Sequence, residues 1–286
     1  WNDVFAHPNY DAFWKARTPL PHLKNVKPAV LTVGGWFDAE DLYGALHTYE
    51  AIEKNNPGAQ NTLVMGPWSH GGWARGPGDA LGNIRFDVKT GEWFREQVEL
   101  PFFNFYLKDK GEFKQPDVWT FRTGANEWKG YAQWPPVEAQ TKSLYFKAGN
   151  KLAFDAPSEN KEAFDEYVSD PQKPVPYSAN NSGNRFSGYM VEDQRFTVGR
   201  SDVLTYQTEA LATDLTLAGP INADLFVSTT GTDADFVVKV IDVYPDNSPS
   251  NAGSQMLVRA EVMRGKYRRS FLKPEPFTPN QPTEVK

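Results

Sequence analysis

The sequence predicts an α/β region followed by an all-β region, because the pattern of strand-like and helix-like segments changes once along the chain. From residue 1 to about residue 110, apolar strand-like runs alternate with helix-like segments. From about residue 115 onward, the regular pattern consists of short alternating strands separated by Gly, Asn, Asp and Pro. A β/α stretch followed by strands alone indicates two domains. We place them at residues 1–112 and 113–286.

The first region contains a predicted strand–helix–strand unit. The apolar run Pro28–Gly35 ends in two glycines, which is typical of a buried parallel strand. A second apolar strand, Thr62–Gly66, follows after Asn55–Gly58 has ended the intervening helix. This order predicts a right-handed crossover into a parallel sheet. The helix between the strands carries apolar residues on one face, at Leu42, Ala45, Leu46, Tyr49 and Ile52.

After the second predicted strand, the sequence predicts one more helix, which is followed by short strands. The helix runs from Glu92 to about Lys108, and Pro101 is expected to bend or split it. The polar segment from about residue 155 to 195 is expected to cross the surface. The remaining short runs are typical of a β-sandwich or jelly roll. They are Val118–Arg122, Lys142–Lys147, Leu215–Leu217, Ala223–Thr229 and Phe236–Tyr244.

Composition excludes several classes of partner and chemistry. The net charge is −6, from 36 acidic and 30 basic residues, which argues against nucleic acid as a partner. The absence of Cys excludes disulfides, thiolate metal sites and cysteine nucleophiles. No stretch approaches the about 20 apolar residues that span a bilayer, so we expect no membrane partner. The sequence shows no signal peptide but opens at Trp1 without Met, so we interpret it as starting inside a longer protein.

Two predicted loops carry residues suited to catalysis. Among the four histidines, His70 is the one that follows a predicted parallel strand, in the glycine-flanked loop Gly66–Gly72. Asp38 holds the equivalent place after the preceding strand. Active sites of open α/β sheets lie outside the carboxyl ends of the strands, so the two side chains are expected to meet. A carboxylate beside an imidazole fixes its tautomer. Asp38 is equally well placed as the N-cap of the following helix, and one Asp can do both.

These two loops resemble the acid and histidine motifs of a known family. Gly34–Asp41 and Gly66–Gly72 are similar to the motifs of α-amino-acid ester hydrolases and cocaine esterases. That family includes X-prolyl dipeptidyl aminopeptidases and glutaryl-cephalosporin acylase-like proteins. The resemblance spans nearly the whole chain, since it continues through Thr123–Trp128, Trp134–Pro136, Leu217–Asp224 and Asp233–Val243.

The resemblance implies a fold and a mechanism. The fold would be the C-terminal portion of an α/β-hydrolase domain followed by a jelly-roll β-sandwich. The family's order is serine, acid, histidine, so Asp38 would be the orienting acid and His70 the general base. The sequence contains no Gly-x-Ser-x-Gly, so the nucleophile would lie upstream and this chain alone would be inactive. Neither a metal nor an organic cofactor is implied, and a periplasmic or secreted location is suggested.

The resemblance also implies how a substrate would be held. Glu40 and Asp41 would hold a free α-ammonium group of the substrate. The alternative is that these acids complement the dipole of the helix that follows. Trp36, Phe37, Trp68 and Trp73 would wall an acyl pocket, and they fit the hydrophobic core equally well.

Three functions are therefore compared. In the first, the parent protein is a serine hydrolase or acyltransferase for small esters or amides with a free α-amino group. In the second, it is an X-Pro dipeptidyl aminopeptidase. In the third, the jelly roll is a non-catalytic binding module that uses Trp119, Trp128 and Trp134. Hydrogen-bond reach between Asp38 and His70, about 2.6–3.2 Å, separates the third from the others. A truncated sheet would expose an edge, so a homo-oligomer or other covering contact is also expected.

Overall fold

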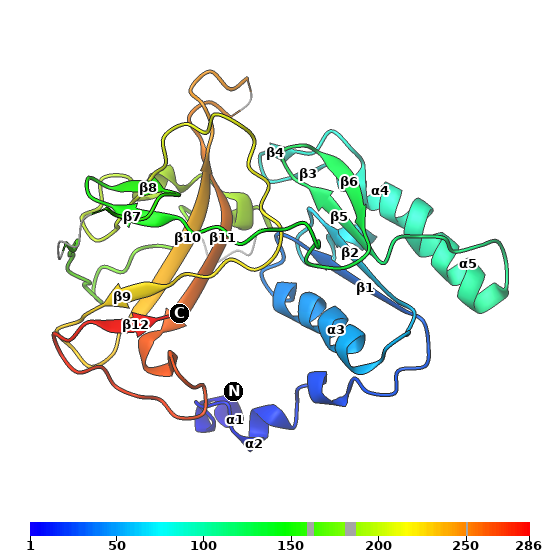
Figure 1. Cartoon of the computed structure of the whole chain (residues 1–286), viewed down its shortest axis with the longest axis horizontal. Coiled ribbons are helices and arrows are strands. Elements are labelled where there is room, and N and C mark those ends of the chain that lie inside the picture. Colours follow the sequence, from blue (N-terminus) through cyan, green and yellow to red (C-terminus); the bar gives the residue numbers. More distant parts are fainter. Residues whose placement is uncertain (159–162, 181–186, 250) are drawn as a thin grey trace.

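A mixed four-stranded sheet forms the centre of the first region (Figure 1). The computed structural model describes residues 1–158, 163–180, 187–249 and 251–286. The sheet has the order β1-β2-β5-β6, in which β1, β2 and β5 are parallel and β6 is antiparallel to β5. The predicted strand–helix–strand unit is confirmed. Its elements are β1 (Val30–Gly35), α3 (Leu42–Asn55) and β2 (Asn61–Gly66), and the sheet is completed by β5 (Val118–Arg122) and β6 (Glu127–Tyr131).

Strand β2 is buried along its whole length because helices cover both faces of the sheet. Leu63 and Met65 point to one face and pack with Tyr49 of α3. Val64 points to the other face and packs with Phe94 and Val98. Alternate side chains of a strand point to opposite faces, so an uninterrupted apolar run suits a strand in the middle layer of three.

The second long helix is interrupted at the place that the sequence predicts. It consists of α4 (Thr90–Phe94), a π-helical turn (Arg95–Glu99) and α5 (Leu100–Lys108). Pro101 stands at the start of α5 and has no N–H to offer the carbonyl of Gln97, four residues earlier. The side-chain amide of Gln115 donates to that carbonyl instead, at 3.2 Å. The interruption therefore has a satisfied backbone rather than an unpaired acceptor.

One predicted strand belongs to a different sheet than expected. Val118–Arg122 was expected among the strands of the second region, and this assignment is wrong. As β5 it lies parallel to β2, with Leu63 opposite Val118 and Met65 opposite Thr120. Val118, Thr120 and Phe121 are all buried, because the strand is covered on both faces. The four-stranded sheet therefore extends beyond residue 112, and a domain division between residues 112 and 113 stays a prediction.

Antiparallel pairs build the second region. The longest pairs β10 (Asp235–Val243) with β11 (Gln255–Arg264), and its register shifts between Val240 and Ile241. Predicted Leu215–Leu217 forms no strand. Among the described residues these strands form separate two-stranded pairs, so the closed jelly roll stays a prediction. The shorter pairs are β9 (Leu225–Val227) with β12 (Thr283–Val285) and β7 (Tyr145–Lys147) with β8 (Lys151–Ala153).

The segment from residue 155 to 195 ends inside the protein and not on its surface, so that expectation is wrong for its last part. Residues 159–162 and 181–186 of it lie outside the described residues. Beyond them, Ser187–Val191 and Gln194–Thr197 form 3-10 turns. Met190 and Val191 are buried against Phe37, Phe121 and Met256, the last of which lies on β11. This cluster joins the two regions, because it takes side chains from both.

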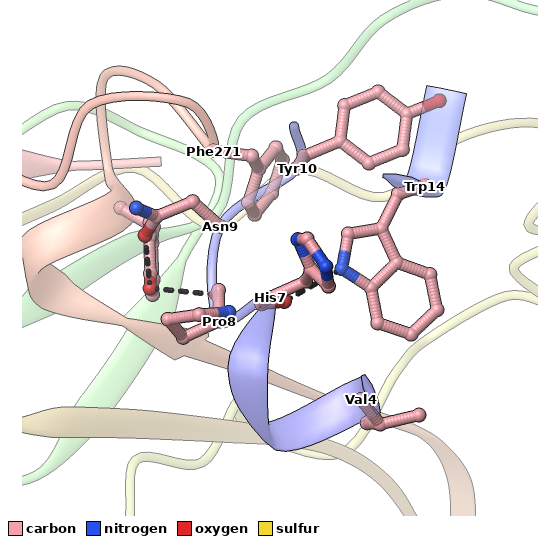
Figure 2. A pocket seen from close by; sticks show the side chains of 8 residues that line it. Val4, His7, Pro8, Asn9, Tyr10, Trp14 and Phe271 are labelled. Atoms are coloured by element: carbon pink, nitrogen blue, oxygen red, sulfur yellow. Dashed lines mark hydrogen bonds between the residues drawn. The ribbon is translucent and has the colours of Figure 1, made fainter. Parts of the chain in front are cut away.

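The N-terminal segment packs against a loop near the C-terminal end of the chain (Figure 2). The hydroxyl of Tyr267 lies 2.9 Å from the carbonyl oxygen of Pro8 and 2.9 Å from Oδ1 of Asn9. The N–H of Tyr10 donates to the carbonyl of Phe271 at 2.9 Å. A shallow pocket of about 340 Å³ lies at this contact. The short elements not yet described are α1 (Asn2–Ala6), α2 (Ala12–Lys15), β3 (Ala80–Leu81), β4 (Ile84–Arg85) and 3-10 turns at Leu20–His22, Gly72–Ala74 and Gly265–Tyr267.

No helix in the described part of the chain combines the length and the apolar character needed to cross a membrane.

The buried cluster that joins the two regions should contribute strongly to the free energy of unfolding. Phe121 is 1% exposed and contacts Phe86 and Trp128 edge-on. We expect Phe121→Ala to lower the free energy of unfolding by about 3–5 kcal/mol, because a large buried side chain leaves a cavity. Urea unfolding followed by tryptophan fluorescence measures the change. Phe103→Ala is the matched control, since Phe103 is 44% exposed on α5, and should change stability by about 0.5 kcal/mol or less. Equal losses in the two variants would contradict this account.

Candidate active site

The loops that follow β1 and β2 meet at one edge of the sheet. Gly35 lies opposite Gly66 in the parallel register. Beyond the strands, the N–H of Trp36 donates to the carbonyl of Gly66 at 2.8 Å, and that of Phe37 to the carbonyl of Trp68 at 3.1 Å. A Cβ at Gly35 would collide with the backbone carbonyl of Trp68. Glycine is therefore required where the two loops approach each other.

This approach brings Asp38 and His70 within hydrogen-bond distance. Nδ1 of His70 lies 3.0 Å from Oδ2 of Asp38. The carboxylate is 1% exposed, whereas the imidazole is 46% exposed. An ionised carboxylate only accepts, so Nδ1 carries the hydrogen and the neutral imidazole has its lone pair on Nε2. An oriented imidazole with a free basic nitrogen can act as a general base.

The second oxygen of Asp38 organises the loop that follows. Oδ1 accepts the backbone N–H of Glu40 at 2.8 Å and that of Asp41 at 3.1 Å. The N-cap position of α3 is Asp41 and not Asp38. The alternative of Asp38 as the helix cap is therefore replaced by a related role, in which its side chain fixes the turn just before the helix. The two oxygens serve His70 and the loop separately.

The two acids predicted to hold an ammonium lie on the exposed side of this loop. Oδ2 of Asp41 is 3.9 Å from Nδ1 of His70, and its side chain is 67% exposed. Glu40 is also exposed and lines a groove described below. The structure therefore gathers Asp38, Asp41 and His70, and it places Glu40 on the same loop, in the lining of the groove.

The two tryptophans that would wall the pocket pack in or against the core. Trp68 is 3% exposed and donates its indole N–H to Oγ1 of Thr90 at 2.8 Å. Trp36 donates its indole N–H to the carbonyl of Phe121 at 3.0 Å and packs against the buried clusters. Of the two alternatives for these indoles, the core describes Trp68, and Trp36 is partly buried at the edge of two core clusters. Phe37 is also buried in the cluster that joins the two regions.

A groove of about 500 Å³ lies between the acid loop and the second region. Its size is in the range of small-molecule sites. The sequence offers no local signal for its far wall, because the contributing segments are more than 100 residues apart and meet only in the folded chain. The lining residues are Asp38, Ala39, Glu40, Leu42 and Tyr43 on one side, and Tyr177, Tyr189, Met190, Val237, Arg259, Ala260, Glu261 and Val262 on the other.

Within the described ranges, no group of three or more His, Asp or Glu side chains is arranged to hold a metal ion.

Comparison with known proteins gives the family. Residues 112–286 match the family model of the X-Pro dipeptidyl-peptidase C-terminal non-catalytic domain, and residues 1–72 match that of the X-Pro dipeptidyl-peptidase of the S15 family. The chain belongs to the X-Pro dipeptidyl-peptidase family. This confirms the resemblance that the two loop motifs indicated.

Individual similar proteins agree with this assignment. Cocaine esterase of Rhodococcus sp. (strain MB1 Bresler) is 28% identical over 96% of this chain and 47% of its own length. The crystal structure of an aminopeptidase from a marine sediment Thaumarchaeota archaeon is 40% identical with a TM-score of 0.92, over 100% of this chain and 48% of that one. An α-amino acid ester hydrolase structure is 39% identical with a TM-score of 0.92, over 100% and 49%. The chain thus spans about half the length of these relatives.

The Asp38 contact makes a prediction about the tautomer of His70. In Asp38→Asn, the amide oxygen should stay with the two backbone N–H groups and the amide nitrogen should face His70. Nδ1 then becomes an acceptor, and the hydrogen moves to Nε2. Imidazole ¹⁵N chemical shifts of the neutral form, measured on this chain, report the tautomer. His47, whose Nδ1 lies 2.9 Å from the carbonyl of Tyr43, is the internal control and should not change. An unaltered His70 tautomer would show that Asp38 does not orient the ring.

Proposed function

We propose that the protein containing this chain is a serine-type hydrolase or acyltransferase for small esters or amides with a free α-amino group. The observation that carries the proposal is the 3.0 Å contact between Nδ1 of His70 and Oδ2 of buried Asp38, at the carboxyl edge of two parallel strands. It is the acid–base half of a catalytic triad. The names of the similar proteins, an esterase, an aminopeptidase and an ester hydrolase, support the same class of chemistry.

In the proposed reaction, Nε2 of His70 takes the proton of a serine hydroxyl as its oxygen bonds to the substrate carbonyl carbon. The protonated ring then gives this proton to the leaving alkoxide or amine as the carbonyl–leaving-group bond breaks. Asp38 holds the ring and stabilises the imidazolium between these steps. The chain has no Gly-x-Ser-x-Gly, so the proposal assigns the nucleophile to polypeptide outside these 286 residues. Water or a second amine releases the acyl group.

The acidic loop supports a substrate with a positive charge. The Glu40 and Asp41 backbone is fixed by Asp38, both residues are exposed, and Oδ2 of Asp41 lies 3.9 Å from Nδ1 of His70. In an α-amino ester the ammonium nitrogen is two bonds from the carbonyl carbon, so an ammonium held at this loop keeps the reacting carbonyl close to it. The proposal also includes closure of the second region into a jelly roll in the intact protein, and a homo-oligomeric or other contact along the exposed edge of β1.

The X-Pro dipeptidyl aminopeptidase is the second candidate, and the description of the matching family models favours it. Both candidates need an ammonium anchor. Cleavage of a glycyl-prolyl anilide and of a phenylglycine methyl ester by the full-length protein separates them. The binding-module hypothesis loses support, since the distance between Asp38 and His70 is within hydrogen-bond reach and Trp128 packs in a stack with Trp93.

His70→Ala tests the proposed base. In the full-length protein, meaning these residues together with the polypeptide that supplies the serine, we expect turnover to fall by about 10³-fold or more. His47→Ala is the matched control, because His47 stacks on Tyr43 of α3 and takes no part in the reaction. Circular dichroism and turnover are measured for both. Turnover that persists in His70→Ala would reject the assignment.

Glu40→Gln tests the ammonium anchor. The side chain keeps its size and loses its charge, so kcat/KM for an α-amino ester should fall by about tenfold or more, since a hydrogen bond to a charged group contributes about 1.5–3 kcal/mol. The same ester without the amine should react within twofold of wild type. Asp41→Asn, measured in parallel, is expected to show the same selectivity. Equal losses on the two substrates would refute anchoring.

A further inference from the structure

The two walls of the groove beside the acid loop differ in charge: among the described residues, the charged side chains of the loop wall are acidic, and the wall from the second region has Arg259 together with Glu261. One wall is the loop with the exposed carboxylate of Glu40. The other wall comes from the second region, and it carries Arg259, which is the single cation among the described residues that line the groove. His70 does not line it. The groove therefore suits the side chain of an α-amino acid substrate, whereas the reacting carbonyl would lie at the imidazole of His70.

Arg259 is placed on this wall by an irregularity in β11. Ile241 pairs with Leu257 and Val240 pairs with Arg259, so Val258 is an extra residue on β11. Such a bulge changes the direction in which the following side chains point, and bulges are common next to active sites. Arg259 follows the bulge directly. The bulge therefore lies directly before the part of β11 that lines the groove.

The Arg259 guanidinium is paired with one carboxylate in the described part of the chain. Its Nη2 lies 3.0 Å from Oε2 of Glu261, two residues along the same strand. Arg259 is 28% exposed, whereas Glu261 is 74% exposed, so the cation lies deeper in the wall than its partner. An exposed pair of this kind is weak. A guanidinium has five N–H donors in a planar fork that matches a carboxylate, and Glu261 engages one nitrogen.

The neighbouring tyrosine belongs to the same wall. Burial raises the pKa of the Tyr177 phenol, and the charges of Arg259 and Glu261 act on it in opposite directions. The neutral hydroxyl remains a donor. Lys239 holds the Tyr177 segment in place, because its Nζ donates to the Tyr177 carbonyl at 3.1 Å and to Oε1 of Gln194 at 2.6 Å. The wall is thus a supported donor surface.

We propose that Arg259 selects substrates whose acyl group carries a carboxylate on its side chain as well as an α-ammonium group. The substrates would be esters or amides of acidic α-amino acids. The ammonium lies at Glu40, the reacting carbonyl lies at His70, and the side-chain carboxylate crosses the groove to the guanidinium. This inference rests on the proposed function and adds the substrate class to it.

The test compares the α-methyl esters of L-glutamate and L-glutamine, which differ in one charge and have nearly the same shape. In the full-length protein, kcat/KM for the glutamate ester should exceed that for the glutamine ester. Arg259→Gln should lower kcat/KM for the glutamate ester by about tenfold or more. It should leave kcat/KM for the glutamine ester within twofold of the wild-type value. Arg259→Lys should retain part of the preference, because it keeps the charge and loses the fork.

Glu261→Gln is the matched control because it removes the competing carboxylate and frees the guanidinium. It should raise the glutamate-to-glutamine ratio of kcat/KM, the opposite of Arg259→Gln. The inference is overturned if both variants shift this ratio in the same direction. It is also overturned if Arg259→Gln lowers kcat/KM for both esters equally, because the wall then has a structural role only. Cleavage of neither ester by the wild-type protein, or full activity in His70→Ala, would instead reject the proposed function.

Discussion

The buried carboxylate of Asp38 is the interaction on which the rest of the site depends. A carboxylate that is 1% exposed needs hydrogen bonds for both oxygens. One oxygen accepts from His70, and the other accepts from the backbone of Glu40 and Asp41. The same group therefore orients the candidate base and fixes the loop that presents the acidic side chains. Moving Asp38 would disturb both at once, which links the acid–base pair to the substrate-binding loop.

Packing holds this carboxylate in place from behind. Phe37, the residue before Asp38, is buried with Phe121 of β5 and with Met190 and Met256 of the second region. The two regions therefore share a core directly beneath the acid loop. The cluster at that position connects the two regions and also affects the groove. It sets the distance between the loop and β11, and so determines the width of the groove between them.

The second region has a part in the site that its family description does not suggest. Residues 112–286 match a domain described as non-catalytic, and the candidate acid and base both come from the first region. Yet it forms one wall of the groove, where Arg259 follows a bulge in β11. A division of labour follows, in which the sheet edge holds the reacting groups and the β-hairpin faces the more distant part of a ligand. Chemistry and selectivity would then reside on separate regions of the fold.

The sequence by itself determined the features that depend on near neighbours. The βαβ unit, the helical face of α3 and the interruption at Pro101 follow from periodicity and from one missing N–H. The meeting of Asp38 and His70 follows because adjacent parallel strands end at one edge. Sequence could not assign Val118–Arg122 to the first sheet or predict that Met190 is buried, and it could not decide whether Trp36 and Trp68 line a pocket or join the core. An alternating or apolar run shows that a side chain is buried but not which partner covers it. Only the tertiary structure decided these partners, and it alone brought Arg259 opposite Glu40, because those residues are more than 200 positions apart and share no local pattern.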